Sequence, residues 1–125
     1  MILNQSKEHL FMSEHPYSLA FVKNGIVYVS GATTIDYTTH TPVPGRREAL
    51  DAALNEVERR LKSVNANLSH VVKVTYFLRD VSLRTEANQQ FVERFAEPRP
   101  ARSVVGVSDI PYGGIAVIDV IADLN

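Results

Sequence analysis

The chain has 125 residues, a hydrophobic share of 45% and a formal net charge of −1. This length is typical of one domain, so we expect a single domain over residues 1–125 with an ordinary hydrophobic core. The near-neutral charge offers no basic face, and we therefore expect no nucleic-acid partner. Because the chain has no cysteine, disulfides, thiol nucleophiles and cysteine-ligated metals are excluded.

Membrane and metal sites are also not expected. No apolar run approaches the roughly 18–20 residues that a membrane-spanning helix needs. The segment Met1–Glu8 lacks the layout of a signal peptide. We therefore expect a cytoplasmic protein with no membrane partner. None of the four histidines forms a His-x-x-x-His or His-x-His pair, so we expect no metal site. The chain has no Walker motif and no Gly-x-Gly-x-x-Gly, and we expect no cofactor.

The first predicted elements form a hairpin. The mostly apolar run Ser18–Lys23 is followed by Asn24-Gly25, a strong signal for a two-residue turn, and then by the β-rich run Ile26–Ser30. Gly31 either ends the second strand or lets another group approach its backbone closely.

A polar loop precedes the clearest helix. Residues 33–45 contain two prolines and a glycine and predict a loop. The segment Arg46–Val64 has apolar residues at helical spacing, namely Leu50, Ala53, Leu54, Val57, Leu61 and Val64. Its other face is expected to lie in solvent and carries Glu48, Asp51, Glu56, Arg59, Arg60 and Lys62. Asn65 and Asn67 are the predicted stops.

The run Val71–Leu78 is rich in β-branched and aromatic residues and predicts a strand. One face would carry Val72, Val74, Tyr76 and Leu78, and the other Val71, Thr75 and Phe77. Because both faces are apolar, helices should cover one of them and a second subunit is a candidate to cover the other.

A second helix is predicted over Ser82–Phe95, with Ser82 as its N-cap. Strands follow at Ser103–Val107 and Ile115–Ala122, separated by a turn over Ser108–Gly114. The order β-β-α-β-α-β-β predicts an α+β fold in which two helices pack on one face of a sheet.

Two charged residues are candidates for chemistry. Arg102 opens a strand after a proline-bounded corner, and a guanidinium can bind a carboxylate through two parallel hydrogen bonds. The alternative for Arg102 is a surface salt bridge. Asp119 lies within an apolar strand, where it could hold or activate a water molecule. The alternative for Asp119 is an edge position that faces solvent.

Three further polar residues could line a site. Asn88 lies off the apolar stripe of its helix and could bind a ligand or the loop before Arg102, or it could be an exposed helix residue. Tyr17 and Ser30 flank the hairpin and offer hydroxyl groups, although such residues are more often structural.

From about His15 to Ala122 the chain resembles the Rid or YjgF family of reactive intermediate deaminases, which has the older label endoribonuclease L-PSP. The resemblance is carried by several short pieces in a fixed order. These are Pro16-Tyr17, Tyr28-Val29-Ser30-Gly31, the long amphipathic helix, Val72-Lys73-Val74-Thr75, Asn88 with Phe91 and Phe95, and Pro100-Ala101-Arg102-Ser103.

The resemblance implies a chorismate-mutase-like (YjgF-like) fold and a homotrimer with three clefts between subunits. It implies cofactor-free hydrolysis of enamines and imines, such as 2-aminoacrylate, to 2-keto acids and ammonia. By position, Arg102 would bind the substrate carboxylate, and Asp119 would hold the attacking water where imine-deaminating members have Glu. The cleft-lining positions would be Tyr17, Ser30, Gly31, Asn88 and Val104, of which Val104 stands where well-known members have Cys.

Two other functions remain open from the sequence. One is a non-catalytic trimer that binds a small carboxylate and acts in regulation, which the short carboxylate of Asp119 favours. The other is ribonuclease activity or translation inhibition, the older label of the family, against which the near-neutral charge argues.

Overall fold

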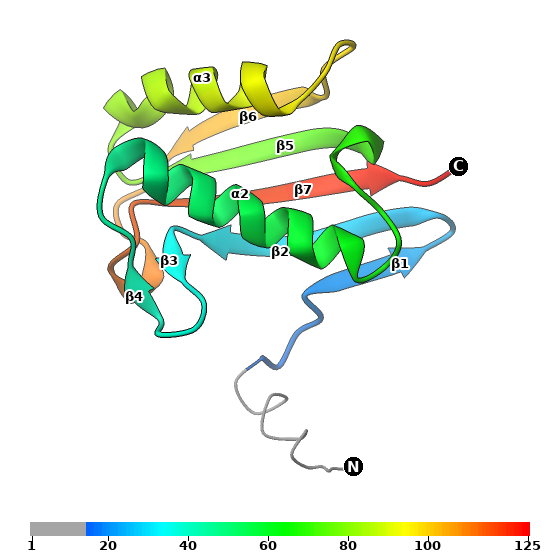
Figure 1. Cartoon of the computed structure of the whole chain (residues 1–125), viewed down its shortest axis with the longest axis horizontal. Coiled ribbons are helices and arrows are strands. Elements are labelled where there is room, and N and C mark those ends of the chain that lie inside the picture. Colours follow the sequence, from blue (N-terminus) through cyan, green and yellow to red (C-terminus); the bar gives the residue numbers. More distant parts are fainter. Residues whose placement is uncertain (1–14) are drawn as a thin grey trace.

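The computed structural model describes residues 15–125. The segment Met1–Glu8, for which the sequence predicts no signal peptide, lies outside the described residues. A five-stranded sheet has the strand order β1-β2-β7-β5-β6, and two helices cover one of its faces (Figure 1). The α+β fold and the element order that the sequence predicts are therefore confirmed. No helix in the described part of the chain is long and apolar enough to span a bilayer.

The first two strands, β1 (Ala20–Lys23) and β2 (Ile26–Thr33), form the predicted antiparallel hairpin. Asn24 and Gly25 have φ angles of 54° and 78°. This left-handed pair matches the twist of the two strands and is the conformation that Asn-Gly favours.

A β-bulge interrupts β2 where it pairs with β7 (Ala116–Asp123). The register shifts across Ser30 and Gly31, so these two residues have no regular pairing partners in β7. The strand continues to Thr33, and the expectation that Gly31 ends it is wrong.

The segment predicted as a loop contains a small second sheet, formed by β3 (Ile35–Asp36) and β4 (Thr41–Pro42). Strands of two residues carry no readable alternation, so the sequence pattern could not show them. Between them, Tyr37 folds back against β2, and its hydroxyl oxygen accepts a hydrogen bond from the backbone N–H of Thr33 at 2.8 Å.

The long helix α2 (Arg46–Lys62) packs its apolar stripe on the sheet. Leu50, Leu54, Val57 and Leu61 are fully buried there. The expectation that Glu56 and Arg60 lie in solvent is wrong, since they are only 6% and 2% exposed. They pair with each other, which offsets the cost of burying two charges. Asn65, one predicted stop, has a φ of 62° just beyond the helix.

Strand β5 (Val71–Leu78) pairs in antiparallel fashion with β7 and in parallel with β6 (Ala101–Gly106). The expectation that Val72 lies on the same face as Val74, Tyr76 and Leu78 is wrong. The register with β7 shifts between Val71 and Lys73, so Val71 is buried and Val72 is 48% exposed.

The second long helix is α3 (Arg84–Arg94), which follows directly on a short 3-10 helix. The predicted N-cap is wrong, because the side chain of Asp80 accepts the backbone N–H of Ser82 at 2.9 Å and caps the 3-10 helix. The three 3-10 helices are η1 (Leu68–His70), η2 (Val81–Leu83) and η3 (Pro111–Gly113).

The face of the sheet opposite α2 and α3 is open in the described part of the chain (Figure 1). Large apolar side chains are exposed on it, including Phe21 at 54%, Tyr28 at 48% and Val105 at 40%. An exposed apolar surface of this kind marks a site of contact with another molecule more often than a free surface.

Candidate active site

Arg102 extends from the edge strand β6 toward helix α3. Its Nη2 donates a hydrogen bond to Oδ1 of Asn88 at 2.7 Å. Its guanidinium carbon lies 5.0 Å from the ring centre of Phe91 and 5.6 Å from that of Tyr76. The two rings and the amide fix the orientation of the cation.

The guanidinium of Arg102 has unused binding capacity. Its Nη1 is buried and has no hydrogen-bond partner among residues 15–125, and no acidic side chain in that range pairs with Arg102. The alternative of a surface salt bridge therefore finds no support in this range. Buried donors are nearly always satisfied, and a carboxylate is the acceptor that fits a guanidinium best.

Asn88 and Val104 complete what we call the arginine cluster, which consists of Asn88, Arg102 and Val104. Asn88 is exposed on α3, as one reading of the sequence expects, yet its amide holds Arg102. Val104 follows Arg102 by two residues on β6, so it lies on the same face of the sheet.

A second set of residues, the bulge cluster, consists of Ser30, Gly31 and Asp119. Strand β7, which bears Asp119, lies in the middle of the sheet, so the alternative of an edge position is wrong. A Cβ placed on Gly31 would lie 4.0 Å from the Cβ of Asp119 and only 2.5 Å from Cγ1 of Val117. Gly31 therefore lets Val117 pack closely against the bulge beside Asp119, where any larger side chain at position 31 would collide with Val117.

The environment of Asp119 alters its basicity. Burial raises the pKa of this half-buried carboxyl above its ordinary value of 3.8, and the charge of Lys73 opposes that shift. A carboxylate with a raised pKa is a better proton acceptor than one in water.

Tyr17 lies beside the bulge cluster. It is exposed, and together with Gly31 and Val117 it lines a cavity of about 110 Å³. The hydroxyl of Ser30 donates to the backbone carbonyl of Ser18 at 2.7 Å, which ties the bulge to the segment that carries Tyr17. The structure thus brings Tyr17, Ser30 and Gly31 close to one another, and their action in one substrate site stays a prediction.

The two clusters lie on opposite faces of the sheet. Arg102 is in register with Val74, which is buried beneath the helices, whereas Asp119 is in register with Thr75 on the open face. Neighbouring residues along a strand point to opposite faces, so a single copy of the chain does not bring Arg102 and Asp119 to one cavity.

Sequence reasoning missed the polar residues beneath the bulge, namely Tyr37, Glu56 and Arg60. Glu56 and Arg60 have the spacing of a helical ion pair, and the sequence alone shows this spacing. Their burial depends on where β1 ends, because Arg60 binds a carbonyl of β2 beyond that end. Among residues 15–125, no group of three or more histidine or acidic side chains could hold a metal ion.

The structure is a small α+β domain in which Asn88 orients the guanidinium of Arg102 at the edge of the sheet. The family model described as Endoribonuclease L-PSP matches residues 7–124. The chain is 37% identical over 108 residues to the mitochondrial protein MMF1 of Saccharomyces cerevisiae, which covers 85% of this chain and 73% of MMF1. It is 32% identical over 108 residues to the 2-iminobutanoate/2-iminopropanoate deaminase of Bos taurus, covering 86% and 79%.

A solved structure agrees with these sequence matches. The crystal structure of RidA from Psychrobacter sp. PAMC 21119 superposes with a TM-score of 0.81 at 30% identity, covering 86% of this chain and 87% of that one. The chain belongs to the Rid/YjgF family, also described as Endoribonuclease L-PSP, and has its fold.

The close packing of Val117 against Gly31 can be tested by substitution. Gly31→Ala should destabilise the protein by about 1–3 kcal/mol, because the new methyl group would overlap Cγ1 of Val117. Val117→Ala removes the overlapping atom, so the double variant should be no less stable than Val117→Ala alone. Urea unfolding of the four proteins measures both effects. A Gly31→Ala protein as stable as the wild type would show that Val117 does not pack tightly against Gly31.

Proposed function

We propose that the protein is a hydrolytic deaminase that converts small 2-imino acids, of the 2-aminoacrylate and 2-iminopropanoate type, to 2-keto acids and ammonia. The observation that carries this proposal is the guanidinium of Arg102, oriented by Asn88 and two rings and left with a donor to spare. The deaminase names of relatives at about 32% identity support it.

The separation of the two clusters supports a cleft between subunits. Arg102 and Asp119 lie on opposite faces of one sheet, so both can act on one substrate only if they come from different copies. The open apolar face, with Phe21, Tyr28 and Val105 exposed, provides the surface on which other copies would pack. A homotrimer with three equivalent clefts meets both requirements.

The proposed reaction requires only an anchored substrate, an attacking water molecule and a proton acceptor. An enamine first tautomerises to its imine, and Arg102 holds the carboxylate. A water molecule beside Asp119 adds to the imine carbon while Asp119 accepts one of its protons. Asp119 then passes that proton to the nitrogen, which gives a carbinolamine. It next accepts the hydroxyl proton and delivers it to the amino group, so that the C=O bond forms as the C–N bond breaks and ammonia leaves a 2-keto acid behind. No redox step occurs, and the cleft contributes mainly orientation and a base of raised pKa.

A non-catalytic carboxylate-binding trimer is the second candidate. Asp119 is one methylene shorter than the Glu of imine-deaminating members, and it is only half buried. In that case Arg102 would hold a small 2-keto acid without turnover. A bound 2-ketobutyrate in a protein with no measurable deaminase activity would favour this candidate.

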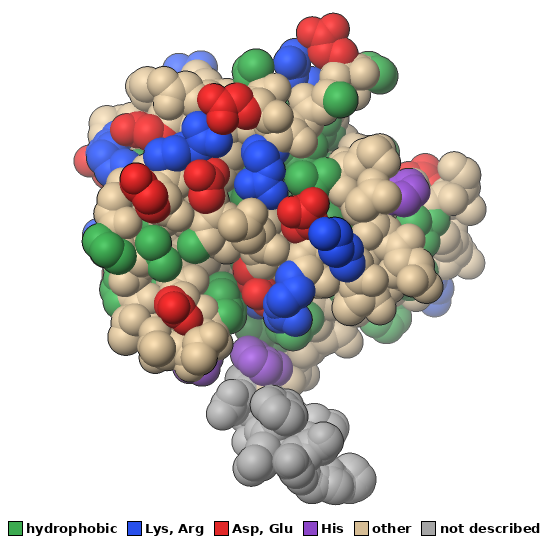
Figure 2. Space-filling view, viewed as in Figure 1, with side chains coloured by type: hydrophobic (Ala, Val, Ile, Leu, Met, Phe, Trp, Pro, Cys, Tyr) green, Lys and Arg blue, Asp and Glu red, His purple; other side chains and the backbone are tan. Residues whose placement is uncertain are grey.

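Ribonuclease activity has less support. On the helix-covered face, basic and acidic side chains alternate and form no continuous basic stripe (Figure 2). Nucleic-acid backbones are bound by concentrated positive charge, which this face does not offer.

The role of Arg102 can be measured by ammonia release from 2-iminopropanoate generated in the assay by an amino-acid oxidase. Both Arg102→Ala and Arg102→Lys should lose about 100-fold in kcat/KM, because lysine cannot form two parallel hydrogen bonds to a carboxylate. Arg84→Ala removes an exposed arginine from the same helix that bears Asn88 and should act as wild type. Equal rates in wild type and Arg102→Ala would contradict the anchoring role.

The role of Asp119 predicts a pH dependence. Its carboxyl must be ionised to accept a proton, so kcat/KM should fall on the acid side with a midpoint above the ordinary value of 3.8. Lys73→Met removes the opposing charge and should move the midpoint further upward. The rate of spontaneous imine hydrolysis is subtracted at each pH. An acid limb unchanged in Asp119→Asn would show that another group accepts the proton.

A further inference from the structure

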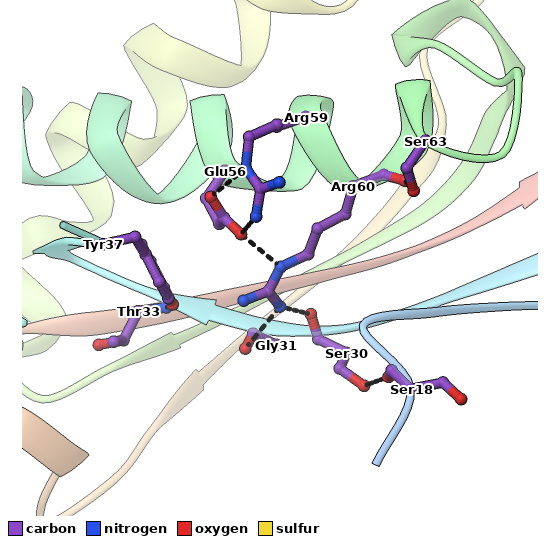
Figure 3. Close-up of polar contacts among 9 residues, drawn as sticks. All are labelled: Ser18, Ser30, Gly31, Thr33, Tyr37, Glu56, Arg59, Arg60 and Ser63. Carbon is purple, nitrogen blue, oxygen red and sulfur yellow. Dashed lines mark hydrogen bonds and ion pairs between the residues drawn. The ribbon is translucent and has the colours of Figure 1, made fainter. Parts of the chain in front are cut away.

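A buried ion pair lies between helix α2 and the bulge of β2 (Figure 3). Nε of Arg60 donates to Oε2 of Glu56 at 2.8 Å, and these side chains are 2% and 6% exposed. Arg59, on the outer side of the helix, binds the same carboxylate but is 63% exposed. Buried pairs are costly to desolvate and contribute little net stability, so the burial of this one calls for a further reason.

The reason lies in the second hydrogen bond that Arg60 makes. Its Nη1 donates to the backbone carbonyl oxygens of Ser30 and Gly31, at 2.8 and 3.4 Å (Figure 3). The ladder between β1 and β2 ends at Ala20 and Val29, so within residues 15–125 no strand pairs with these carbonyls on that side. Arg60 therefore takes the place of a neighbouring strand at the bulge.

Arg60 also reaches the far side of the bulge through Tyr37. The guanidinium carbon lies 5.3 Å from the centre of the Tyr37 ring, and the hydroxyl of that ring accepts the N–H of Thr33. The backbone is thus held at the bulge by Arg60 directly and after the bulge by Tyr37, which packs on Arg60.

Glu56 keeps this arrangement charged. Burial acts to raise its pKa, but the hydrogen bonds from Arg59 and then Arg60 outweigh burial, so the pKa of Glu56 lies below its ordinary value. An arginine suits this place because its planar fork can bind a carboxylate and two carbonyls at once, which a lysine cannot do.

We propose that Arg60 is a positioning residue for the deaminase cleft, which it shapes by fixing the Ser30–Gly31 bulge beside Asp119. The proposal rests on the proposed function, since it concerns the same site. Gly31 borders Asp119 on one side and accepts from Arg60 on the other, so a shift of the bulge changes the space beside the carboxylate. A displacement of about 1 Å in such a site costs on the order of 100-fold in rate.

The experiment compares Arg60→Gln with Arg59→Gln. Both variants remove one arginine from Glu56, but only Arg60 contacts the bulge, so Arg59→Gln is the matched control. We expect kcat/KM on 2-iminopropanoate to fall about 10- to 100-fold in Arg60→Gln and less than about twofold in Arg59→Gln. Arg60→Lys keeps the charge beside Glu56 and should fold even if Arg60→Gln does not. Arg60→Lys should show part of the fall in kcat/KM that we expect for Arg60→Gln.

A second readout does not depend on catalysis. Amide hydrogen exchange at Ser30 and Thr33, whose N–H groups are hydrogen-bonded on either side of the bulge, should accelerate in both Arg60 variants and not in Arg59→Gln. Equal exchange in the Arg60 and Arg59 variants would overturn the proposal. So would faster exchange with unchanged kinetics. An inactive wild type would instead overturn the proposed function, and the exchange data would still decide whether Arg60 holds the bulge.

Discussion

Side chains alternate between the two faces of a sheet, and this constraint separates Arg102 from Asp119. Arg102 shares the helix-covered face with Val74, whereas Asp119 shares the open face with Thr75. Each half of the site is well formed by itself: the arginine is oriented by Asn88, and the carboxylate is bordered by Gly31. Under the proposed function, chemistry that needs both residues requires a second copy of the chain, and the exposed apolar side chains of the open face are where that copy would pack.

The open half of the site depends on a backbone irregularity. The Ser30–Gly31 bulge occurs where β1 has ended, so its carbonyls need partners from elsewhere in the fold. Helix α2 supplies one in Arg60, and Glu56 keeps that buried cation paired. A charged network beneath the sheet thus shapes the space beside Asp119 without touching it.

Much of the fold could be predicted from the sequence because turns and helix faces are specified by residues close together in the chain. Asn24-Gly25 specifies its turn through the backbone angles it favours, and the stripe of α2 specifies which face is buried. The errors arose where distant contacts override local pattern. Arg60 looks like a solvent-facing residue on its helix, and Val72 changes face only because β5 slips against β7. The residues of the candidate site could be chosen from the resemblance, but their division between two faces depends on strand pairing that the pattern does not specify.

The most direct test of a shared cleft is subunit complementation between Arg102→Ala and Asp119→Asn. The two variants carry different affinity tags and are refolded together, so that mixed trimers can be isolated. In a closed ring where each cleft takes Arg102 from one copy and Asp119 from the next, every mixed trimer contains one intact cleft. Deaminase activity should then recover to about one third of wild type per trimer, although each variant alone retains little activity. Mixed trimers no more active than the two parents would show that both residues act within one chain, and would contradict a cleft built between subunits.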